Sequence, residues 1–201
     1  MSEAQENPLR VKRRTAILEA ADRLFKHYGF EKTTVADIAH AARIGVGSVY
    51  LEFDSKETVA RELSKRCHDH VLTAMRHAAS AEESFARRLR ATFDARATHF
   101  WEVASTGPHA LELVSPGTCS GTALERERFE EAEQALLIEL LEAGDAAGEL
   151  RIVDAPASAG VLLRIYATYA PPRLFEQDPA ETKRILAATH ELVVHGLLRR
   201  A

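Results

Sequence analysis

Residues 16–59 read AILEAADRLFKHYGFEKTTVADIAHAARIGVGSVYLEFDSKETV, and this stretch decides the fold. Apolar residues recur there at spacings of three and four between Ile17 and Tyr28, as on one face of an amphipathic helix. Gly29 follows directly and can adopt the backbone conformation that ends a helix. The pattern therefore predicts a first helix over about residues 10–28.

Two very short helices are expected next. Thr34 and Asp37 have the spacing of a capping box, so a helix should begin at Thr34 and end near Ala41. After a brief turn, residues 45–52 suit a second short helix, and residues 54–57 form the cap of a longer one. Two short helices joined by a tight turn are a helix-turn-helix candidate.

The composition favours an all-helical protein. The chain has 201 residues, of which 46% are apolar, 28% charged and only 6% aromatic, which excludes a fibre or a disordered tail. No segment has the roughly 18 apolar residues that a membrane span needs, so we expect no membrane contact and a cytoplasmic protein. Cys67 and Cys119 are too few for a disulfide framework, and reduced thiols are expected.

Charge is unevenly distributed along the chain. The formal net charge is -4, yet residues 8–50 hold 8 Lys and Arg against 4 Asp and Glu. A positive face near the N-terminus could therefore meet a polyanion, which the acidic remainder would repel. The run Arg10, Lys12, Arg13 and Arg14 is read either as an arm that reaches DNA or as an ordinary solvated run.

Sequence signals that begin and end helices continue to the C-terminus. Caps, breakers and apolar stripes predict about nine helices in all, including a short one at 109–114. The longer helices are expected at about 54–80, 81–103, 122–143, 156–169 and 179–199.

The quoted stretch resembles the DNA-binding domain of the tetracycline-repressor (TetR) family over about 45 residues. The matching features keep their order and spacing; among them are Ala20-Ala21, Thr33-Thr34-Val35, Asp37-Ile38-Ala39, Tyr50 and Ser55-Lys56-Glu57. The resemblance implies an N-terminal three-helix DNA-binding domain at 8–54, with the helix-turn-helix at about 34–53. It also implies a helical ligand-binding and dimerisation domain at 55–201.

Each expected DNA contact has a physical reason. The start of the helix at Thr34 offers backbone N–H groups and a positive dipole end to a phosphate. The helix at 45–52 would enter the major groove, where its glycines allow close backbone approach and small side chains meet base edges. Tyr50 and Lys56 would contact the DNA backbone on either flank. The residues expected to contact DNA are Thr34, Arg43, Gly45, Val46, Gly47, Ser48, Tyr50 and Lys56.

Two positions depart from the family pattern. Arg43 stands where glycine is usual in the turn, so either the turn takes a strained positive φ that costs on the order of 1 kcal/mol, or its geometry differs. Arg43 could then gain a phosphate contact. Gly45 stands where serine is frequent, which removes a hydrogen-bond donor to DNA.

The resemblance also implies the role of the larger domain. The helices at about 156–170 and 179–199 should pair two subunits through a four-helix bundle, so that a homodimer meets a palindromic operator. A cavity in this domain should take a small, mostly hydrophobic effector that acts as an inducer, and no further cofactor is expected. The effector candidates are Phe93, His99, Phe100, Trp101, His109, Tyr166 and Tyr169.

Three other classes of function were weighed. Cys67 and His70 could share a metal ion, but His77 lies about 10 Å further along the helix axis, so no metal site is expected. The sequence lacks the GxSxG, HExxH and P-loop motifs, so no enzyme and no catalytic residue is predicted. A helical interaction protein that has lost DNA binding is opposed by the intact set of Thr34, Tyr50 and Lys56.

Overall fold

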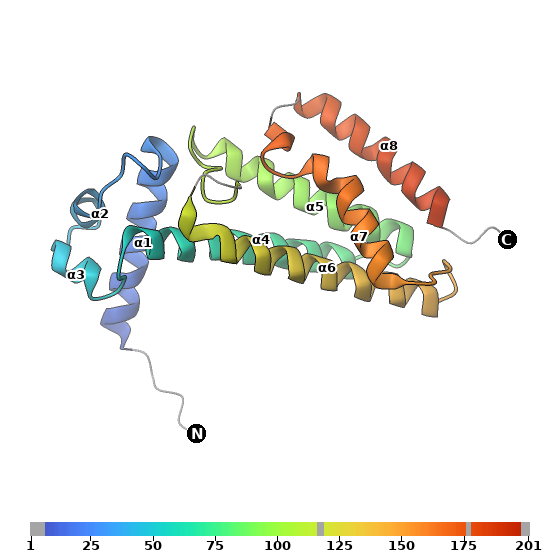
Figure 1. Ribbon diagram of the computed structural model, residues 1–201, viewed down its shortest axis with the longest axis horizontal. Helices are drawn as coiled ribbons and strands as arrows, with labels where there is room; N and C mark the ends of the chain where they lie inside the picture. Colours follow the sequence, from blue (N-terminus) through green and yellow to red (C-terminus); the bar gives the residue numbers. More distant parts are fainter. Residues whose placement is uncertain (1–6, 116–118, 176–177, 198–201) are drawn as a thin grey trace, which may run out of the picture.

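The structure, a computed structural model, describes residues 7–115, 119–175 and 178–197. Within these ranges it contains eight α-helices and no strand, which confirms the all-helical prediction. The molecule is elongated, with a small head of three helices at one end and a long helical body beside it (Figure 1). No helix in the described ranges has the length and apolar character needed to cross a membrane.

The head consists of α1 (Pro8–Tyr28), α2 (Val35–Ala41) and α3 (Val46–Tyr50). Gly29 ends α1 with a φ of 88°, and its N–H donates to the carbonyl of Phe25. The apolar stripe predicted for α1 packs against α2, α3 and the start of the next helix. The fully buried members of this head core include Ile17, Ala20, Ala21, Phe25, Ile38, Val49, Phe53 and Val59.

The body begins with α4 (Lys56–Ser80), which runs from the head along the length of the molecule (Figure 1). Its first turns belong to the head core and its later turns to the body core, so this helix joins the two. The boundary expected between residues 54 and 55 falls just before it. The body is completed by α5 (Phe85–Ser105), α6 (Ala123–Ala146), α7 (Ala155–Tyr166) and α8 (Pro179–Leu197).

The short helix expected at 109–114 is wrong: these residues form consecutive turns. The amides of Glu112 and Val114 bond to carbonyls three residues earlier. The segment is instead fixed to the head, because His109 N donates to the carbonyl of Lys26 and Phe30 N donates to the Glu112 carboxylate at 2.8 Å. These contacts hold the chain across the end of α1 rather than letting a helix form.

Two helix ends also differ from the sequence prediction. The helix expected from residue 81 begins at Phe85, where the Glu149 carboxylate accepts a 2.8 Å hydrogen bond from the first helical amide. The helix expected to reach residue 169 ends at Tyr166 and continues as a single 3-10 turn over Ala167–Tyr169. Residues 198 and 199, expected to end the last helix, lie outside the described residues.

Candidate functional site

The turn between α2 and α3 keeps the tight geometry of a helix-turn-helix despite its arginine. Arg43 has a φ of 57°, the only positive φ at a non-glycine residue among those described. Its N–H donates to the carbonyl of His40, and the following amide, Ile44 N, donates to Ala39 O. The side chain of Arg43 is exposed, so its charge is open to solvent beside the start of α3.

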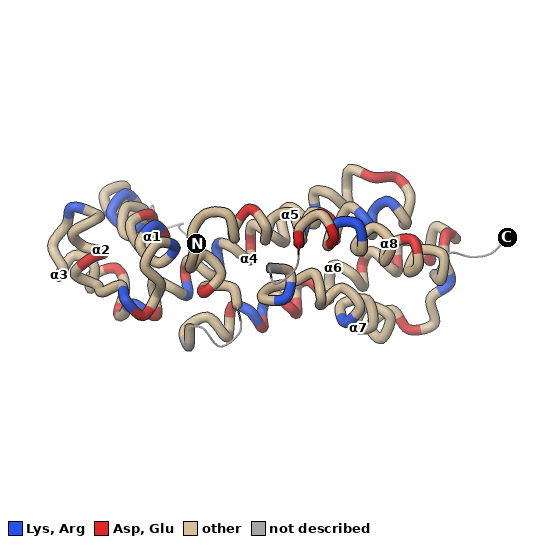
Figure 2. The backbone as a smooth tube through the Cα atoms, turned by 90° about the horizontal axis from the view of Figure 1, so that it is seen from above, with Lys and Arg blue, Asp and Glu red and all other residues tan. Residues whose placement is uncertain are grey.

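One face of α3 is held by the core and the opposite face is open. Val49 is buried, whereas Val46, Tyr50 and Leu51 are 42%, 53% and 73% exposed. A Cβ built at Gly45 or Gly47 would meet nothing within 4 Å apart from its chain neighbours. No charged residue lies between Arg43 and Glu52, and the tube through α3 is tan, the colour of uncharged residues (Figure 2). This open, uncharged surface, with half-buried Ser48 beside it, is suited to contact with base edges.

Thr34 forms the predicted capping box at the start of α2. Its Oγ1 accepts from Asp37 N at 3.2 Å, and the Asp37 carboxylate accepts from Thr34 N and from the Thr34 hydroxyl. These hydrogen bonds from Thr34 lower the pKa of Asp37, which keeps a negative charge at the helix start. A phosphate contact at Thr34 stays a prediction, and this carboxylate would lie next to that phosphate.

Lys56 is half-buried at the first position of α4 and already has a partner. Its Nζ donates to the backbone carbonyl of Phe30 at 2.7 Å and lies 4.1 Å from the centre of the Phe30 ring. An ammonium group carries three N–H donors, so this contact leaves others for a phosphate. The structure therefore gives Lys56 a role inside the head, next to its predicted role on DNA.

The basic run at 10–14 is helical and lies within α1, not in an extended arm. Arg10 and Arg13 both pair with Glu52, whose side chain is only 1% exposed, and Arg14 donates to the Glu52 carbonyl at 3.2 Å. Arg14 also lies over the ring of Phe53, 4.2 Å from its centre. Glu52 directly follows the C-cap of α3, so these arginines fix α3 against α1. Sequence reasoning missed Glu52, because its partners lie about forty residues away in the chain.

The predicted effector residues do not gather around one cavity. Phe93 and Tyr166 stack with ring centres 3.6 Å apart, and Phe100 packs on Phe129. Tyr166 OH and Tyr169 OH lie within hydrogen-bond distance of His190 Nδ1 and Thr189 Oγ1, at 2.7 and 2.8 Å. Four of the seven are therefore buried in the body core.

The other three effector candidates do not belong to this buried group and do not line a common cavity. His109 is at the end of α1, 2.7 Å from the Glu112 carboxylate. His99 lines a cleft of about 290 Å³ between α1, α4 and α5, and Trp101 lines a cavity of about 330 Å³ between α5 and α8. Of the seven candidates, His99 and Trp101 line cavities in the part of the body that the structure describes.

Cys67 and His70, the two residues considered for a shared metal ion, have packing contacts instead. Burial raises the pKa of the Cys67 thiol to about 11, far from the thiolate that a metal requires. The ring of His70 packs edge-on against that of His99, with centres 5.4 Å apart.

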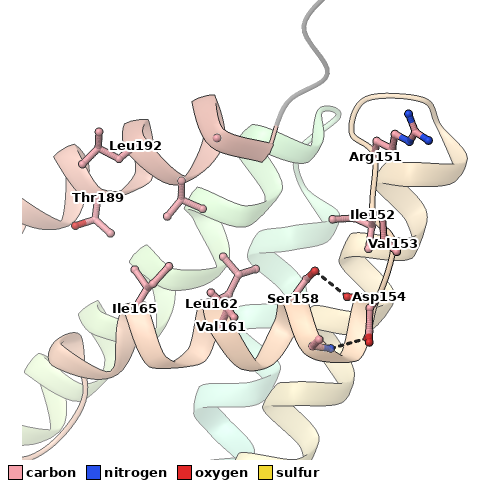
Figure 3. A pocket seen from close by; sticks show the side chains of 13 residues that line it. Arg151, Ile152, Val153, Asp154, Ser158, Val161, Leu162, Ile165, Thr189 and Leu192 are labelled. Carbon is pink, nitrogen blue, oxygen red and sulfur yellow. Dashed lines mark hydrogen bonds between the residues drawn. The ribbon is translucent and has the colours of Figure 1, made fainter.

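A long apolar groove lies between α7 and α8 (Figure 3). Its volume is about 850 Å³, and Val161, Leu162, Ile165 and Leu192 line it. Leu192 is 78% exposed, and Val161 and Ile165 are about half exposed. This exposed apolar surface lies on the two helices that the sequence analysis expects to pair subunits.

The helix-turn-helix region has known relatives. Residues 17–63 match the model of the bacterial regulatory proteins of the tetR family. The HTH-type transcriptional regulator YhgD of Bacillus subtilis is 27% identical over 198 residues, covering 93% of this chain and 97% of that protein. Residues 17–63 therefore form a TetR-family helix-turn-helix region.

Two further comparisons reach beyond the helix-turn-helix region. The HTH-type transcriptional repressor KstR2 of Rhodococcus jostii is 37% identical over 102 residues, half of this chain and 48% of that repressor. The fatty acid degradation regulator FadR of Bacillus halodurans has the same fold, with a TM-score of 0.67, 21% identity and coverage of 94% and 96% of the two chains. The matched family and the relatives' names describe transcriptional regulators and not enzymes.

Proposed function

We propose that this TetR-family regulator is a ligand-responsive repressor that acts in the cytoplasm. It binds a palindromic operator as a homodimer and is released by a small-molecule inducer. The observation that carries the proposal is the open, uncharged face of α3. This helix lies between Arg43 and the Glu52 clasp, which we define as the ion pairs of Glu52 with Arg10 and Arg13.

Docking of α3 in the major groove assigns a role to each exposed residue. Val46 and Ser48 meet base edges, while Gly45 and Gly47 let the backbone approach. The surrounding residues Thr34, Arg43, Tyr50 and Lys56 would contact phosphates and fix the register on the duplex. Residues 8–54 form the DNA-binding domain in this proposal and residues 55–201 the ligand-binding and dimerisation domain.

Dimerisation covers the groove between α7 and α8. A single helix-turn-helix offers few contacts, and a two-fold dimer matches the two half-sites of a palindrome. Exposed Leu192 and Val161 would be buried between α7 and α8 of one protomer and the same helices of its partner.

Release by an inducer requires a ligand that prefers the conformation unable to bind DNA. The names of two relatives refer to fatty acid degradation and to ketosteroids, which supports a mostly hydrophobic effector. His99 and Trp101 are the candidates retained for ligand contact, because each lines a hollow in the body.

Selection from a pool of random duplexes, with purified ligand-free protein at near-physiological salt, tests the proposal. Recovery of an inverted repeat that binds two protomers is the expected result. Recovery of nothing by protein shown to be folded would contradict DNA binding by the free protein and favour a helical interaction protein.

A further inference from the structure

The cavity between α5 and α8 has a lining unlike that of the apolar groove. Its volume is about 330 Å³, within the usual range for a small-molecule site. Arg90, Asp94, Thr98 and Trp101 line it from α5, where spacings of three and four place them on one helix face. Lys183 and Leu186 face them from α8.

Trp101 carries a polar group that the fold leaves unsatisfied. Its indole Nε1–H is buried and has no hydrogen-bond partner among the described residues. An unpaired buried donor is unfavourable, and such a group in a native structure calls for an explanation. Because this nitrogen is closed to solvent, a ligand with an acceptor oxygen would reach it only if the Trp101 ring shifts, and such a shift would change the emission of the ring.

The two cations of the cavity are weakly engaged. Lys183 Nζ lies 5.4 Å from the centre of the Trp101 ring and forms no ion pair with a carboxylate in the described part of the chain. Arg90 reaches Asp94 and Glu191 only at 3.6 and 3.7 Å. Because their ion pairs are long or absent, both cations can bind an anion that enters the cavity.

Asp94 is the one carboxylate in the lining, and it has partners already. Its Oδ1 lies 3.1 Å from His190 Nε2, and Arg90 lies beside its other oxygen. The side chains that line the cavity sum to one positive charge, which Glu191 outside the lining offsets only through its 3.7 Å contact with Arg90. The Trp101 ring and Leu186 provide apolar surface. An anionic head on an apolar body is the chemistry that matches this combination.

We propose that the cavity binds a small organic carboxylate, with its carboxylate between Arg90 and Lys183 and its apolar part against Trp101 and Leu186. This inference deepens the proposed ligand response and rests on that proposal only for its effect on DNA. Asp94 bonds to His190 of α8, which in turn bonds to Tyr166 of α7. Binding beside Asp94 would therefore shift the two helices that carry the proposed dimer surface.

The test uses Trp101, the single tryptophan of the chain, as its own reporter. Cyclohexanecarboxylate, cyclohexylmethanol and cyclohexylmethylammonium are titrated into the full-length protein while tryptophan emission and the melting temperature are recorded. We expect a saturable emission change and a higher melting temperature with the carboxylate alone. Absence of both effects, or equal or tighter binding of the alcohol or the ammonium, would overturn the proposal.

Variants locate the site. Lys183→Gln and Arg90→Gln should each weaken carboxylate binding by about tenfold, because each removes a charge-assisted contact. Arg184→Gln is the matched control, since Arg184 is exposed, adjacent in sequence and outside the lining. Unchanged binding in both lining variants, or equal loss in the control, would exclude this cavity.

Duplex binding is measured separately. If the carboxylate binds saturably but the affinity for duplex DNA does not change, the binding site is supported and its effect on DNA binding is refuted. Carboxylate binding by a protein that binds no duplex would refute only the proposed DNA function.

Discussion

The ammonium of Lys56 is joined to Phe30 twice, by a 2.7 Å hydrogen bond to its carbonyl and by a position 4.1 Å from its ring centre. Phe30 lies in the connection between α1 and α2, and its own N–H donates to Glu112 of the body. The first residue of α4 thus helps to hold the connection that precedes the helix-turn-helix.

Substitution of Lys56 should therefore affect both stability and DNA binding. We expect Lys56→Gln to lower the melting temperature and to reduce the slope of log affinity against log salt by about one, through the loss of a phosphate contact. Tyr50→Ala should weaken binding to all duplexes without the loss of stability, because Tyr50 is 53% exposed. Melting curves measure the effect on stability, and salt titrations measure the effect on DNA binding. A salt slope equal to that of the wild type in Lys56→Gln would show that Lys56 does not contact a phosphate.

Arg43 offers a test in which stability and affinity change in opposite directions. A left-handed conformation at a non-glycine residue costs about 1–2 kcal/mol, and glycine offsets part of this gain through its larger unfolded-state entropy. Arg43→Gly should therefore raise the free energy of unfolding by roughly 0.5–1 kcal/mol. The same change should weaken duplex binding if the exposed guanidinium contacts phosphate. Chemical denaturation and duplex titration measure both, and a less stable glycine variant would show that the turn is not strained.

Local patterns in the sequence were sufficient for much of the head. The capping box of Thr34 and Asp37 and the helix end at Gly29 depend on residues within four positions, and the structure contains both. The positive φ considered for Arg43 is likewise a property of one turn.

Features that depend on distant segments could not be predicted in this way. Glu52 meets Arg10 and Arg13 only after α1 and α3 have packed, and residues 109–114 are turns because they bind the end of α1. Aromatic residues also gave no indication of whether they line a cavity. Phe93 and Tyr166 stack on each other in the core, whereas Trp101 lies at a cavity with an unpaired donor.

The Glu52 clasp predicts a specific dependence of stability on pH. Hydrogen bonding from Arg13, opposed in part by burial and aided by Arg10, holds the pKa of Glu52 below its ordinary value of 4.5. A carboxyl whose pKa is lowered on folding contributes stability that is present above the unfolded pKa and lost as pH falls through the folded pKa. Wild type should therefore be more stable than Glu52→Gln near neutral pH, and this difference should shrink below about pH 4.5. Melting temperatures of both proteins across this range test the clasp, which a pH-independent difference would contradict.

The groove between α7 and α8 predicts the effect of a charge on its rim. Leu192→Lys would place an ammonium in the proposed dimer interface, where its desolvation is unfavourable. We expect the wild type to sediment as a dimer and the variant as a monomer that keeps its helical circular dichroism. Leu124→Lys is the control, because Leu124 is another exposed leucine, at 48%, but lies at the start of α6, outside the groove. A monomeric wild type, or equal dimerisation of Leu192→Lys, would refute this interface.

Gly47 gives the most direct test of how closely the backbone of α3 approaches DNA. A Cβ at this position meets no atom within 4 Å in the free protein apart from its chain neighbours and the backbone of its own helix. Glycine inside a helix is less favourable than alanine by about 0.5–1 kcal/mol, so Gly47→Ala should be at least as stable as the wild type. If α3 lies in the major groove with its backbone against the bases, the added methyl group enters space that the duplex needs, and affinity for the selected operator should fall. Gly148→Ala is the control for stability, because Gly148 also has open space but a φ of 73°, so alanine there should be strained and leave duplex affinity unchanged. A Gly47→Ala protein that folds and binds the operator like the wild type would show that this face of α3 does not approach the bases.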